Sequence, residues 1–329
     1  MSSKRILLTG ASGCIGHYIA ERLIQATDHE LFLLVRDPQK LKIDVEARPG
    51  VTVLQGDMRQ IERFGNLLKT IHTAILTATA WGDPQMTYDV NVVKTIRLMN
   101  LLDPEVCEQV IYFSTESILD HDNKPLKEAG EIGTDYIRTK YICHQQLPKL
   151  AIAPKITTVF PTLVFGGDET KPKSHLTAGL PGVIRWLGLA RFFKADASFH
   201  FVHGEDIARV VVHLTDNPPP AGAARELVLG SAPMTVNQAI ADLCRYFNKR
   251  IYLQIPLTPA LANIFIRVFR IRMAAWDRFC LNYRHFTHKD PVSPAQFGLP
   301  VYCETISDLM RASNIGPRKK PVLRPKFEE

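Results

Sequence analysis

Short apolar runs alternate with amphipathic stretches along the first half of the chain. The runs have the length and residue types of buried β-strands, and they read RILLT, ELFLLV, VTVLQ, TAILTAT, QVIYFS and KITTVF. Between them, the spacing of apolar positions predicts helices over about residues 14–26, 58–69, 84–102 and 134–148. Apolar strands separated by helices are typical of a parallel sheet covered on both faces. The pattern therefore predicts an α/β fold, a doubly wound parallel sheet of the Rossmann type.

The alternation stops after residue 165. Residues 166–200 are rich in Gly, Pro and Lys and contain one short predicted helix near 181–188. Further helices are predicted over 203–216, 235–248 and 259–276, with the strand ELVLG between the first two. We therefore predict three parts: a dinucleotide-binding domain (1–165 and 201–230), a smaller, mostly C-terminal substrate-binding lobe (166–200 and 231–316) and a basic, disordered tail (317–329).

The composition is that of an ordinary globular enzyme, with 46% apolar and 22% charged residues among 329. No apolar run reaches the length needed to span a bilayer. The chain enters RILLT almost at once, which leaves no room for a cleaved signal peptide. The six cysteines are scattered without metal-ligand spacing, so we expect reduced thiols, no metal site and a cytoplasmic protein.

The net charge of +7 is distributed unevenly. Residues 248–285 contain many Arg and Lys but a single Asp. Such a bias suits an anionic substrate, an anionic membrane surface or solubility alone. Because no recognition module accompanies the charge, we expect no nucleic-acid partner.

The predicted helix over 259–276 lies within this basic segment. Asn263, Arg267 and Arg270 line one narrow strip of it, and apolar residues cover most of the remainder. A helix this apolar is normally buried, so we expect burial in the substrate lobe. The alternative is a weak peripheral contact with an anionic membrane, with the arginines at the headgroups.

Three glycines, Gly10, Gly13 and Gly16, stand between the first predicted strand and the first predicted helix. Glycines at such a junction let backbone amides approach a pyrophosphate, and the helix N-terminus adds partial positive charge. The spacing G-x-x-G-x-x-G in this strand–turn–helix context predicts a dinucleotide site. The alternative is a tight turn that only packs the helix closely.

The end of the second strand bears on the choice of cofactor. Val35 ends the strand and Arg36 follows. An acidic residue at this point suits the ribose hydroxyls of NAD, whereas an arginine suits the 2′-phosphate of NADP. We therefore expect NADP, with NAD as the alternative because Asp37 is adjacent; an exposed Arg-Asp turn without a role is the other alternative.

Several motifs in order resemble the extended short-chain dehydrogenase/reductase superfamily, of the NAD-dependent epimerase/dehydratase type. They run from Lys4 to about Ile315 and read TGASGCIG, QGDM, TATA, DVNVVKTIRLM, YFSTES, YIRTK, FPTLVFG, FHFVHGEDIA and ELVLGS. The apolar stretch FIRVFRIRMAAW is similar to the substrate lobe of hydroxysteroid-dehydrogenase-like or flavanonol-reductase-like members. Within the resemblance, His200 and His203 are strand-end and helix-start residues.

The resemblance implies that Tyr136 is the general acid/base and Lys140 its partner. A phenol with a pKa near 10 is a poor base at neutral pH, and a nearby ammonium stabilises the phenolate. Positions i and i+4 share one face of a helix, so the two side chains can lie close together. The alternative is an exposed helix pair without a role.

Two further residues are implied to take part in catalysis. Thr115 corresponds to the family's catalytic Ser/Thr, although Ser114 and Ser117 are neighbouring alternatives. Asn91 matches the family's helix asparagine, or it only stitches backbone groups together.

The resemblance also implies a set of cofactor-binding residues. Asp57 would contact the adenine amino group, unless it is a helix N-cap. Lys140 would also reach the nicotinamide ribose. The full set is Gly10, Ser12, Gly13, Cys14, Ile15, Gly16, Arg36, Asp57, Met58, Thr79, Lys140 and Pro161.

Three departures from the family pattern weaken the hypothesis that the substrate is a sugar nucleotide. Phe160-Pro161 replaces the usual Arg-Pro, Cys143 and His144 stand where a Glu is common, and Glu116 lacks the Asp-Glu pair of sugar dehydratases. We therefore expect an NAD(P)-dependent oxidoreductase acting on a hydroxyl or carbonyl of a small, fairly apolar substrate. The alternatives are a sugar-nucleotide epimerase, dehydratase or reductase, and a non-catalytic NADP-binding assembly or sensor protein; a homodimer is left open.

Overall fold

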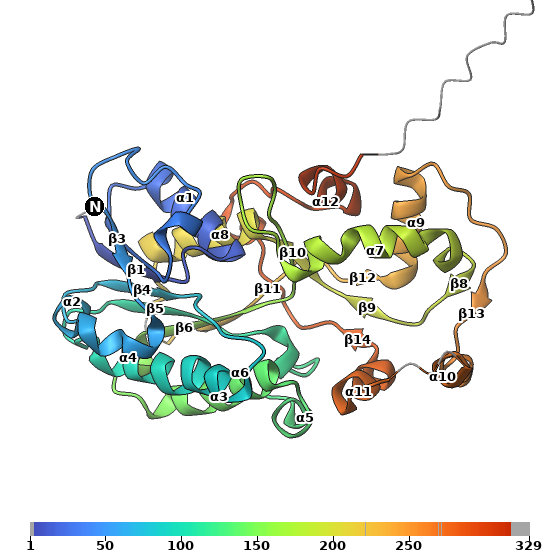
Figure 1. Ribbon diagram of the computed structural model, residues 1–329, viewed down its shortest axis with the longest axis horizontal. Helices are drawn as coiled ribbons and strands as arrows, with labels where there is room; N and C mark the ends of the chain where they lie inside the picture. Colours follow the sequence, from blue (N-terminus) through green and yellow to red (C-terminus); the bar gives the residue numbers. More distant parts are fainter. Residues whose placement is uncertain (1–2, 221, 269, 271, 317–329) are drawn as a thin grey trace, which may run out of the picture.

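A parallel sheet forms the centre of the molecule (Figure 1). The structure, a computed structural model, describes residues 3–220, 222–268, 270 and 272–316. The seven strands are hydrogen-bonded in the order β11-β6-β5-β4-β1-β2-β3, and every pair is parallel. Their bounds are β1 Arg5–Thr9, β2 Glu30–Val35, β3 Val51–Gln55, β4 Thr73–Leu76, β5 Gln109–Phe113, β6 Ile156–Pro161 and β11 Glu226–Leu229. The predicted doubly wound α/β fold is confirmed.

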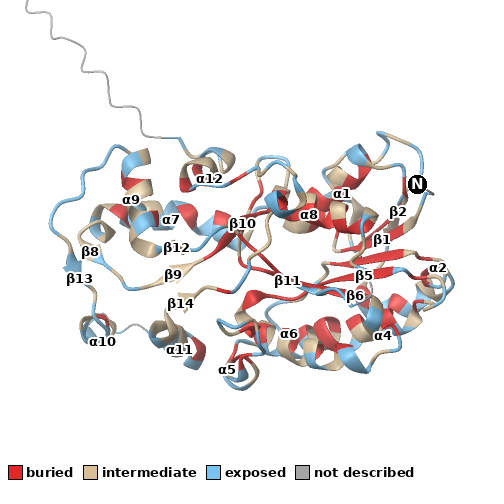
Figure 2. Cartoon of the chain, turned by 180° about the vertical axis from the view of Figure 1, so that it is seen from behind, coloured by how far each residue is buried: buried red, intermediate tan, exposed pale blue. Residues whose placement is uncertain are grey.

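Helices cover both faces of this sheet because successive strand residues point to opposite sides. On β1, Ile6 and Leu8 join an apolar cluster with α1 (Cys14–Ala26) and α8 (Gly204–Asp216). Leu7 joins a second cluster with residues of α4 (Thr95–Leu101) and α6 (Asp135–Gln146) on the other face. Burial accordingly extends along most of β1, β2, β4, β5 and β6, whereas the edge strand β3 has no buried residue (Figure 2). The near-continuous apolar runs of the sequence reflect this burial on two sides.

The helices of the first half differ in detail from their predicted bounds. The predicted helix over 58–69 is a 3₁₀ segment, Met58–Phe64, followed by α2 (Gly65–Leu68). The predicted helix over 84–102 comprises α3 (Pro84–Tyr88), a π-helical turn (Asp89–Lys94) and α4. The strand predicted to reach Thr79 ends at Leu76. The hydroxyl of Thr77 donates to the Thr9 carbonyl at 2.7 Å, which turns the chain across the end of β1.

A smaller lobe packs around a separate apolar cluster that includes Leu180, Phe201, Leu243 and Leu309. Its helices are α7 (His175–Ala190), α9 (Val236–Tyr246), α10 (Pro259–Val268), α11 (Ala275–Tyr283) and α12 (Ile306–Ala312). Its short strands are β8 (Phe193–Lys194), β9 (Ser198–Phe199), β12 (Met234–Thr235), β13 (Ile255–Pro256) and β14 (His285–Phe286). β7 (Leu163–Phe165) pairs with β10 (Phe201–His203), and α5 (Lys127–Glu131) precedes α6.

The prediction of one buried helix over 259–276 is wrong on two counts. α10 ends at Val268, and Arg270 adopts a left-handed conformation with φ 49°. A new helix starts at Ala275, and its first turn is capped by Asp277, whose carboxylate accepts from the Ala274 backbone N–H at 3.1 Å. Of the α10 residues, only Ala262 is buried. The apolar residues of α10 therefore lie largely at the surface.

Two other expectations concern the ends of the chain and membrane crossing. The predicted disordered tail, 317–329, lies outside the described residues. Among the residues that the structure describes, no helix combines the length and the apolar character that crossing a bilayer requires.

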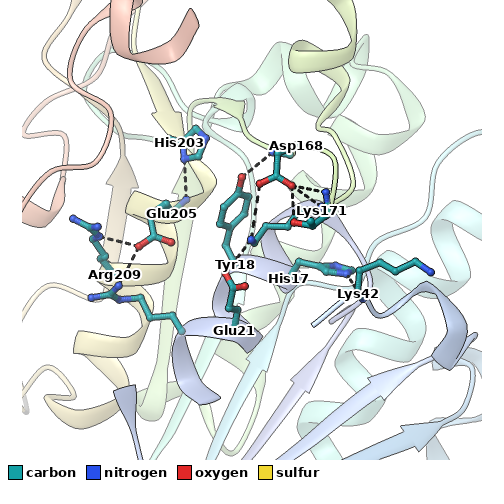
Figure 3. Close-up of polar contacts among 12 residues, drawn as sticks. His17, Tyr18, Glu21, Lys42, Asp168, Lys171, His203, Glu205 and Arg209 are labelled. Carbon is teal, nitrogen blue, oxygen red and sulfur yellow. Dashed lines mark hydrogen bonds and ion pairs between the residues drawn. The ribbon is translucent and has the colours of Figure 1, made fainter. Parts of the chain in front are cut away.

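A group of polar contacts joins α1 to the loop before α7 and to the start of α8 (Figure 3). The Tyr18 hydroxyl accepts from the Gly167 backbone N–H at 2.9 Å. Lys171 Nζ lies 3.0 Å from Glu21 Oε2 and 5.3 Å from the centre of the Tyr18 ring. At the start of α8, His203 Nδ1 accepts from the Glu205 backbone N–H at 3.1 Å. These contacts hold the helix that follows the glycine loop in place.

His203 makes the stability of this junction depend on pH. Burial lowers the pKa of His203 to about 4. A histidine with a lowered folded pKa contributes stability above its unfolded pKa of about 6.5, and this stability is lost as pH falls through about 4. The loss is at most about 3 kcal/mol. We expect His203→Asn, which retains a capping acceptor, to remove this part of the pH dependence.

Urea unfolding of both proteins between pH 7 and pH 4 measures the effect. Burial raises the pKa of Asp206, on the same helix, to about 6. Asp206 therefore gains stability as pH falls, and the informative quantity is the difference between the two pH profiles. Parallel profiles would show that His203 does not titrate as described.

Candidate active site

The glycine loop after β1 forms a cradle that side chains would fill. Gly10 has φ +71°, and a Cβ there would lie 2.8 Å from the Ala78 nitrogen. A Cβ on Gly16 would lie 2.1 Å from the Gly10 carbonyl oxygen. Gly13 is the N-cap of α1, so the free amides of the first helical turn face this loop. The cradle fits a pyrophosphate, and Ser12, Gly13, Cys14 and Ile15 are at least partly exposed around it.

The residues predicted near the adenosine lie at the ends of β2 and β3. Arg36 is exposed directly after β2. Asp57 caps the 3₁₀ segment through a 2.8 Å bond from the Arg59 backbone N–H, and Arg59 Nη2 lies 2.9 Å from its Oδ2. The hydrogen bond from the Arg59 side chain lowers the pKa of Asp57, and the charge of Arg36 contributes. Asp57 is thus an N-cap, Met58 is buried, and Arg59 is a second arginine beside the predicted phosphate site.

Asn91 is fully buried and uses its whole side chain in hydrogen bonds. Its Oδ1 accepts from Ala80 N at 2.8 Å and from Thr79 Oγ1 at 3.0 Å. Its Nδ2 donates to Ala80 O and to Thr139 Oγ1, each at 3.1 Å. Asn91 therefore connects the loop after β4 to α6 through hydrogen bonds. The π-helical turn that carries it is a feature often found at functional sites.

The structure brings Thr115, Tyr136 and Lys140 together between the end of β5 and α6. The Thr115 side chain lies close enough to Tyr136 to lower the pKa of its phenol. Lys140 Nζ donates to the Phe113 carbonyl at 2.7 Å and lies 5.9 Å from the centre of the Tyr136 ring. Of the two serine alternatives, Ser117 Oγ accepts from Thr115 at 3.4 Å. Ser114 Oγ is buried without a hydrogen-bond partner among the described residues.

Burial shifts the two predicted proton-transfer groups in opposite directions. It lowers the pKa of Lys140 to about 8. It raises the pKa of Tyr136 above its usual value, and the charge of Glu116 adds to the increase, whereas the nearby Thr115 side chain lowers this pKa.

Two aromatic features near Tyr136 were not predicted from the sequence. The indole of Trp81, 49% exposed, stacks on the Tyr136 ring with 3.7 Å between ring centres and 12° between ring planes. From the lobe, Trp276, Phe279 and Tyr283 of α11 stack in series with spacings of 5.2 and 5.1 Å. These α11 residues belong to the same apolar cluster as Tyr136. The substrate lobe therefore presents an aromatic wall beside the predicted acid/base.

A buried carboxylate–imidazole pair also adjoins Thr115. Glu116 Oε2 lies 3.4 Å from His288 Nε2, and both side chains are at most 8% exposed. His288 Nδ1 faces the Asp120 carbonyl at 3.0 Å, so this nitrogen carries a proton. The pair joins the loop after β5 to the C-terminal part of the lobe.

The two histidines of FHFVHGEDIA have the positions expected of them. His200 precedes β10, donates through Nδ1 to the Ser231 carbonyl at 2.8 Å and accepts through Nε2 from the His288 backbone N–H at 3.0 Å. His203 ends β10 and caps α8. No group of three or more His, Cys, Asp or Glu side chains in the described part of the chain is arranged to hold a metal ion.

The fold and the assembled Tyr-x-x-x-Lys site define an enzyme of the extended short-chain dehydrogenase/reductase class. Residues 6–230 match the model of the NAD dependent epimerase/dehydratase family, and the chain belongs to this family. Family membership and the glycine cradle together indicate an enzyme that uses a nicotinamide dinucleotide.

One curated relative is sterol demethylase protein B of Methylococcus capsulatus. It is 27% identical over 179 residues, which cover 50% of this chain and 53% of that protein. The match thus spans about half the length of each protein.

Solved structures with the same fold include several members of this class. The crystal structure of gox2253 has a TM-score of 0.67 and 19% identity, with 95% of this chain and 98% of that chain covered. The Bordetella bronchiseptica enzyme WbmG, solved with NAD and UDP, has a TM-score of 0.63 and 14% identity over 95% and 94% of the two chains. UDP-glucose 4-epimerase of Thermotoga maritima has a TM-score of 0.61 and 14% identity over 94% and 98%.

Proposed function

We propose that the protein is an NAD(P)-dependent oxidoreductase that acts on a hydroxyl or carbonyl of a small, fairly apolar substrate. The convergence of Thr115, Tyr136 and Lys140 beside the glycine cradle supports the reaction type. The aromatic wall of α11 beside Tyr136 supports an apolar substrate. The relative whose name refers to a sterol is consistent with such a substrate, and sterols are one class to test.

The proposed roles follow from the contacts of the side chains. In the oxidation of an alcohol, the Thr115 hydroxyl orients the substrate oxygen and Tyr136 Oη takes its proton. The Lys140 ammonium stabilises the phenolate form that Tyr136 must adopt before it can take this proton. A bound nicotinamide cofactor would supply the redox chemistry as the hydride acceptor, while these side chains orient the substrate and move its proton. In reduction the same groups act in the opposite order.

The Glu116–His288 pair is proposed to position the catalytic loop. The contact between Glu116 and His288 holds the residue that follows Thr115 against the lobe. Thr115 and Tyr136 thereby keep their relative positions.

The experiment measures turnover of a panel of substrates through the absorbance of the cofactor at 340 nm. Apolar secondary alcohols and ketones, sterols among them, are compared with UDP- and dTDP-sugars, using both NAD(H) and NADP(H). Net oxidation or reduction of an apolar substrate is the expected result. Conversion of a nucleotide sugar without net change of the cofactor would establish an epimerase instead. Tight cofactor binding without turnover of any panel member would favour an assembly or sensor protein.

We further propose that the cofactor is NADP(H), because Arg36 and Arg59 flank the place where a 2′-phosphate would lie. Arg36→Ala should weaken NADP(H) binding by about 1.5–3 kcal/mol, roughly ten- to a hundredfold, with little effect on NAD(H). Titration calorimetry with both cofactors measures this. The control is Arg63→Ala, at an exposed arginine of the 3₁₀ segment that also contains Arg59. Equal or tighter binding of NAD(H) by the unmodified protein would refute the preference.

A further inference from the structure

The outer end of the substrate lobe exposes an unusual number of large apolar side chains. They come from the C-terminal half of α7, from the segment before and within β13, and from α10, and Leu253 reaches 85% exposure. We call this surface the lobe tip; its apolar members are Val183, Trp186, Leu189, Tyr252, Leu253, Ile255, Ile264 and Val268. Single exposed apolar residues are normal, but a group of this size marks a surface that binds something.

Direct contacts join the three segments into one surface. β13 pairs with β8, with Ile255 opposite Phe193, and the Phe193 ring lies 6.0 Å from that of Phe265 on α10. At the end of α7, Arg191 donates to the Arg250 carbonyl at 2.8 Å and lies 5.6 Å from the Tyr252 ring centre. α10 and the β8–β13 pair accordingly lie at the same end of the molecule in both views (Figures 1 and 2).

The segments that form the lobe tip carry an excess of positive charge. Residues 175–194 and 243–276 contain no Asp or Glu. The cations in these two ranges are Arg185, Arg191, Lys194, Arg245, Lys249, Arg250, Arg267, Arg270 and Arg272. Among the described residues, Arg245 alone of these nine forms an ion pair, with Asp242. The surface is therefore apolar and positively charged at the same time.

A hollow between α10 and α11 concentrates part of this charge. It is lined by Asn263, Ile266, Arg267, Arg270 and Arg278. The Arg278 guanidinium donates to Asn263 Oδ1. Among the described residues, the guanidinium groups of Arg267, Arg270 and Arg278 have no carboxylate partner. Guanidinium groups gathered in this way are suited to phosphate oxygens.

We propose that the lobe tip is a docking surface for an anionic phospholipid bilayer. Trp186, Leu253 and their apolar neighbours enter the interfacial layer, and the surrounding cations contact headgroups. The hollow of Arg267, Arg270 and Arg278 receives the phosphate of one headgroup. Tryptophan and tyrosine at the edge of such a patch have the side chains that membrane–water interfaces favour.

The charge argues against a second copy of the chain as the occupant. A twofold interface places the same patch on both partners, so it would set unpaired arginines against arginines. An anionic bilayer instead supplies opposite charge and apolar chains together. When the lobe tip lies on a bilayer, α11 adjoins the lipid phase. This helix borders the lobe tip at one end and the catalytic site at the other.

Vesicle co-sedimentation of the full chain tests the proposal. The vesicles are phosphatidylcholine alone and an equimolar mixture of phosphatidylcholine and phosphatidylglycerol. We expect binding to the mixed vesicles that is at least about tenfold tighter than to phosphatidylcholine, since each basic residue near an anionic surface adds attraction. The double variants Trp186→Ser/Leu253→Ser and Arg267→Gln/Arg270→Gln should each lower the affinity about tenfold or more.

Matched variants elsewhere on the surface serve as controls. Ile132→Ser removes an exposed apolar side chain, and Arg63→Gln/Arg311→Gln removes two exposed charges outside the lobe tip. Both controls should bind the mixed vesicles like the unmodified protein. The proposal is overturned if the unmodified protein does not sediment with mixed vesicles, or if the lobe-tip variants bind as well as the controls. Dissociation of an oligomer by Trp186→Ser/Leu253→Ser, measured by analytical ultracentrifugation, would assign the surface to self-association instead.

Discussion

Tyr136→Phe should lower turnover of the true substrate by about a hundredfold or more. The substitution removes only the hydroxyl that Thr115 contacts and that is proposed to carry the proton. The ring remains, so its stacking on Trp81 and its packing against α11 should persist. Folding, followed by circular dichroism and thermal unfolding, and cofactor affinity, followed by calorimetry, should therefore change little.

The matched control for this variant is Tyr141→Phe, the same chemical change on the same helix. Tyr141 packs against Gly130 and lies outside the group formed by Thr115, Tyr136 and Lys140. Its turnover should stay close to that of the unmodified protein. Near-normal activity of Tyr136→Phe would remove Tyr136 from the proton-transfer role.

Gly16→Ala should disrupt the start of α1 and with it the cofactor site. A Cβ at this position would lie 2.1 Å from the Gly10 carbonyl oxygen and 2.8 Å from the Ala11 Cα. All of these neighbours are backbone atoms, so the helix must move away from the end of β1. We expect a loss of about 1–3 kcal/mol in the free energy of unfolding and a marked loss of cofactor affinity.

Gly182→Ala offers a comparison with the same added methyl group. Gly182 lies within α7, and a Cβ there would meet no heavy atom within 4 Å. Alanine should therefore stabilise α7 by about 0.5–1 kcal/mol through helix propensity. Urea unfolding and calorimetry on both variants measure the contrast. Equal midpoints and equal cofactor affinities for Gly16→Ala and the unmodified protein would show that the close approach of α1 to β1 is not required.

The parts of the fold that could be predicted depend on local signals. The first helix was predicted over residues 14–26 and extends over Cys14–Ala26, because an apolar strand and a glycine turn fix its start. Thr115, Tyr136 and Lys140 were predicted through motifs on consecutive elements of the sheet layer, and the structure brings them together. Parallel strands place their carboxyl ends at one edge, so such residues converge by topology.

What could not be predicted depends on contacts between distant segments. His288 stands 172 residues from Glu116, and nothing in the local pattern around either residue indicates the pairing. Trp81 directly follows the TATA motif, but its sequence position does not indicate that its ring stacks on Tyr136. The end of α10 at Val268 was not predicted because every residue from 259 to 276 tolerates a helix. Asp277, which caps the next helix, is a weaker sequence signal than the helical spacing of the apolar residues.

The placement of the tryptophans gives the protein three optical reporters in separate environments. The chain contains three of them, and Trp81 lies against Tyr136, Trp186 at the lobe tip and Trp276 within the aromatic wall. Their exposures of 49%, 64% and 7% predict different emission maxima and different access for a soluble quencher such as acrylamide. Stacking on Tyr136 makes the Trp81 fluorescence sensitive to whatever enters the active site. Single-tryptophan versions of the protein would therefore report on ligand entry and surface contact independently, in the same cuvette and without any attached dye.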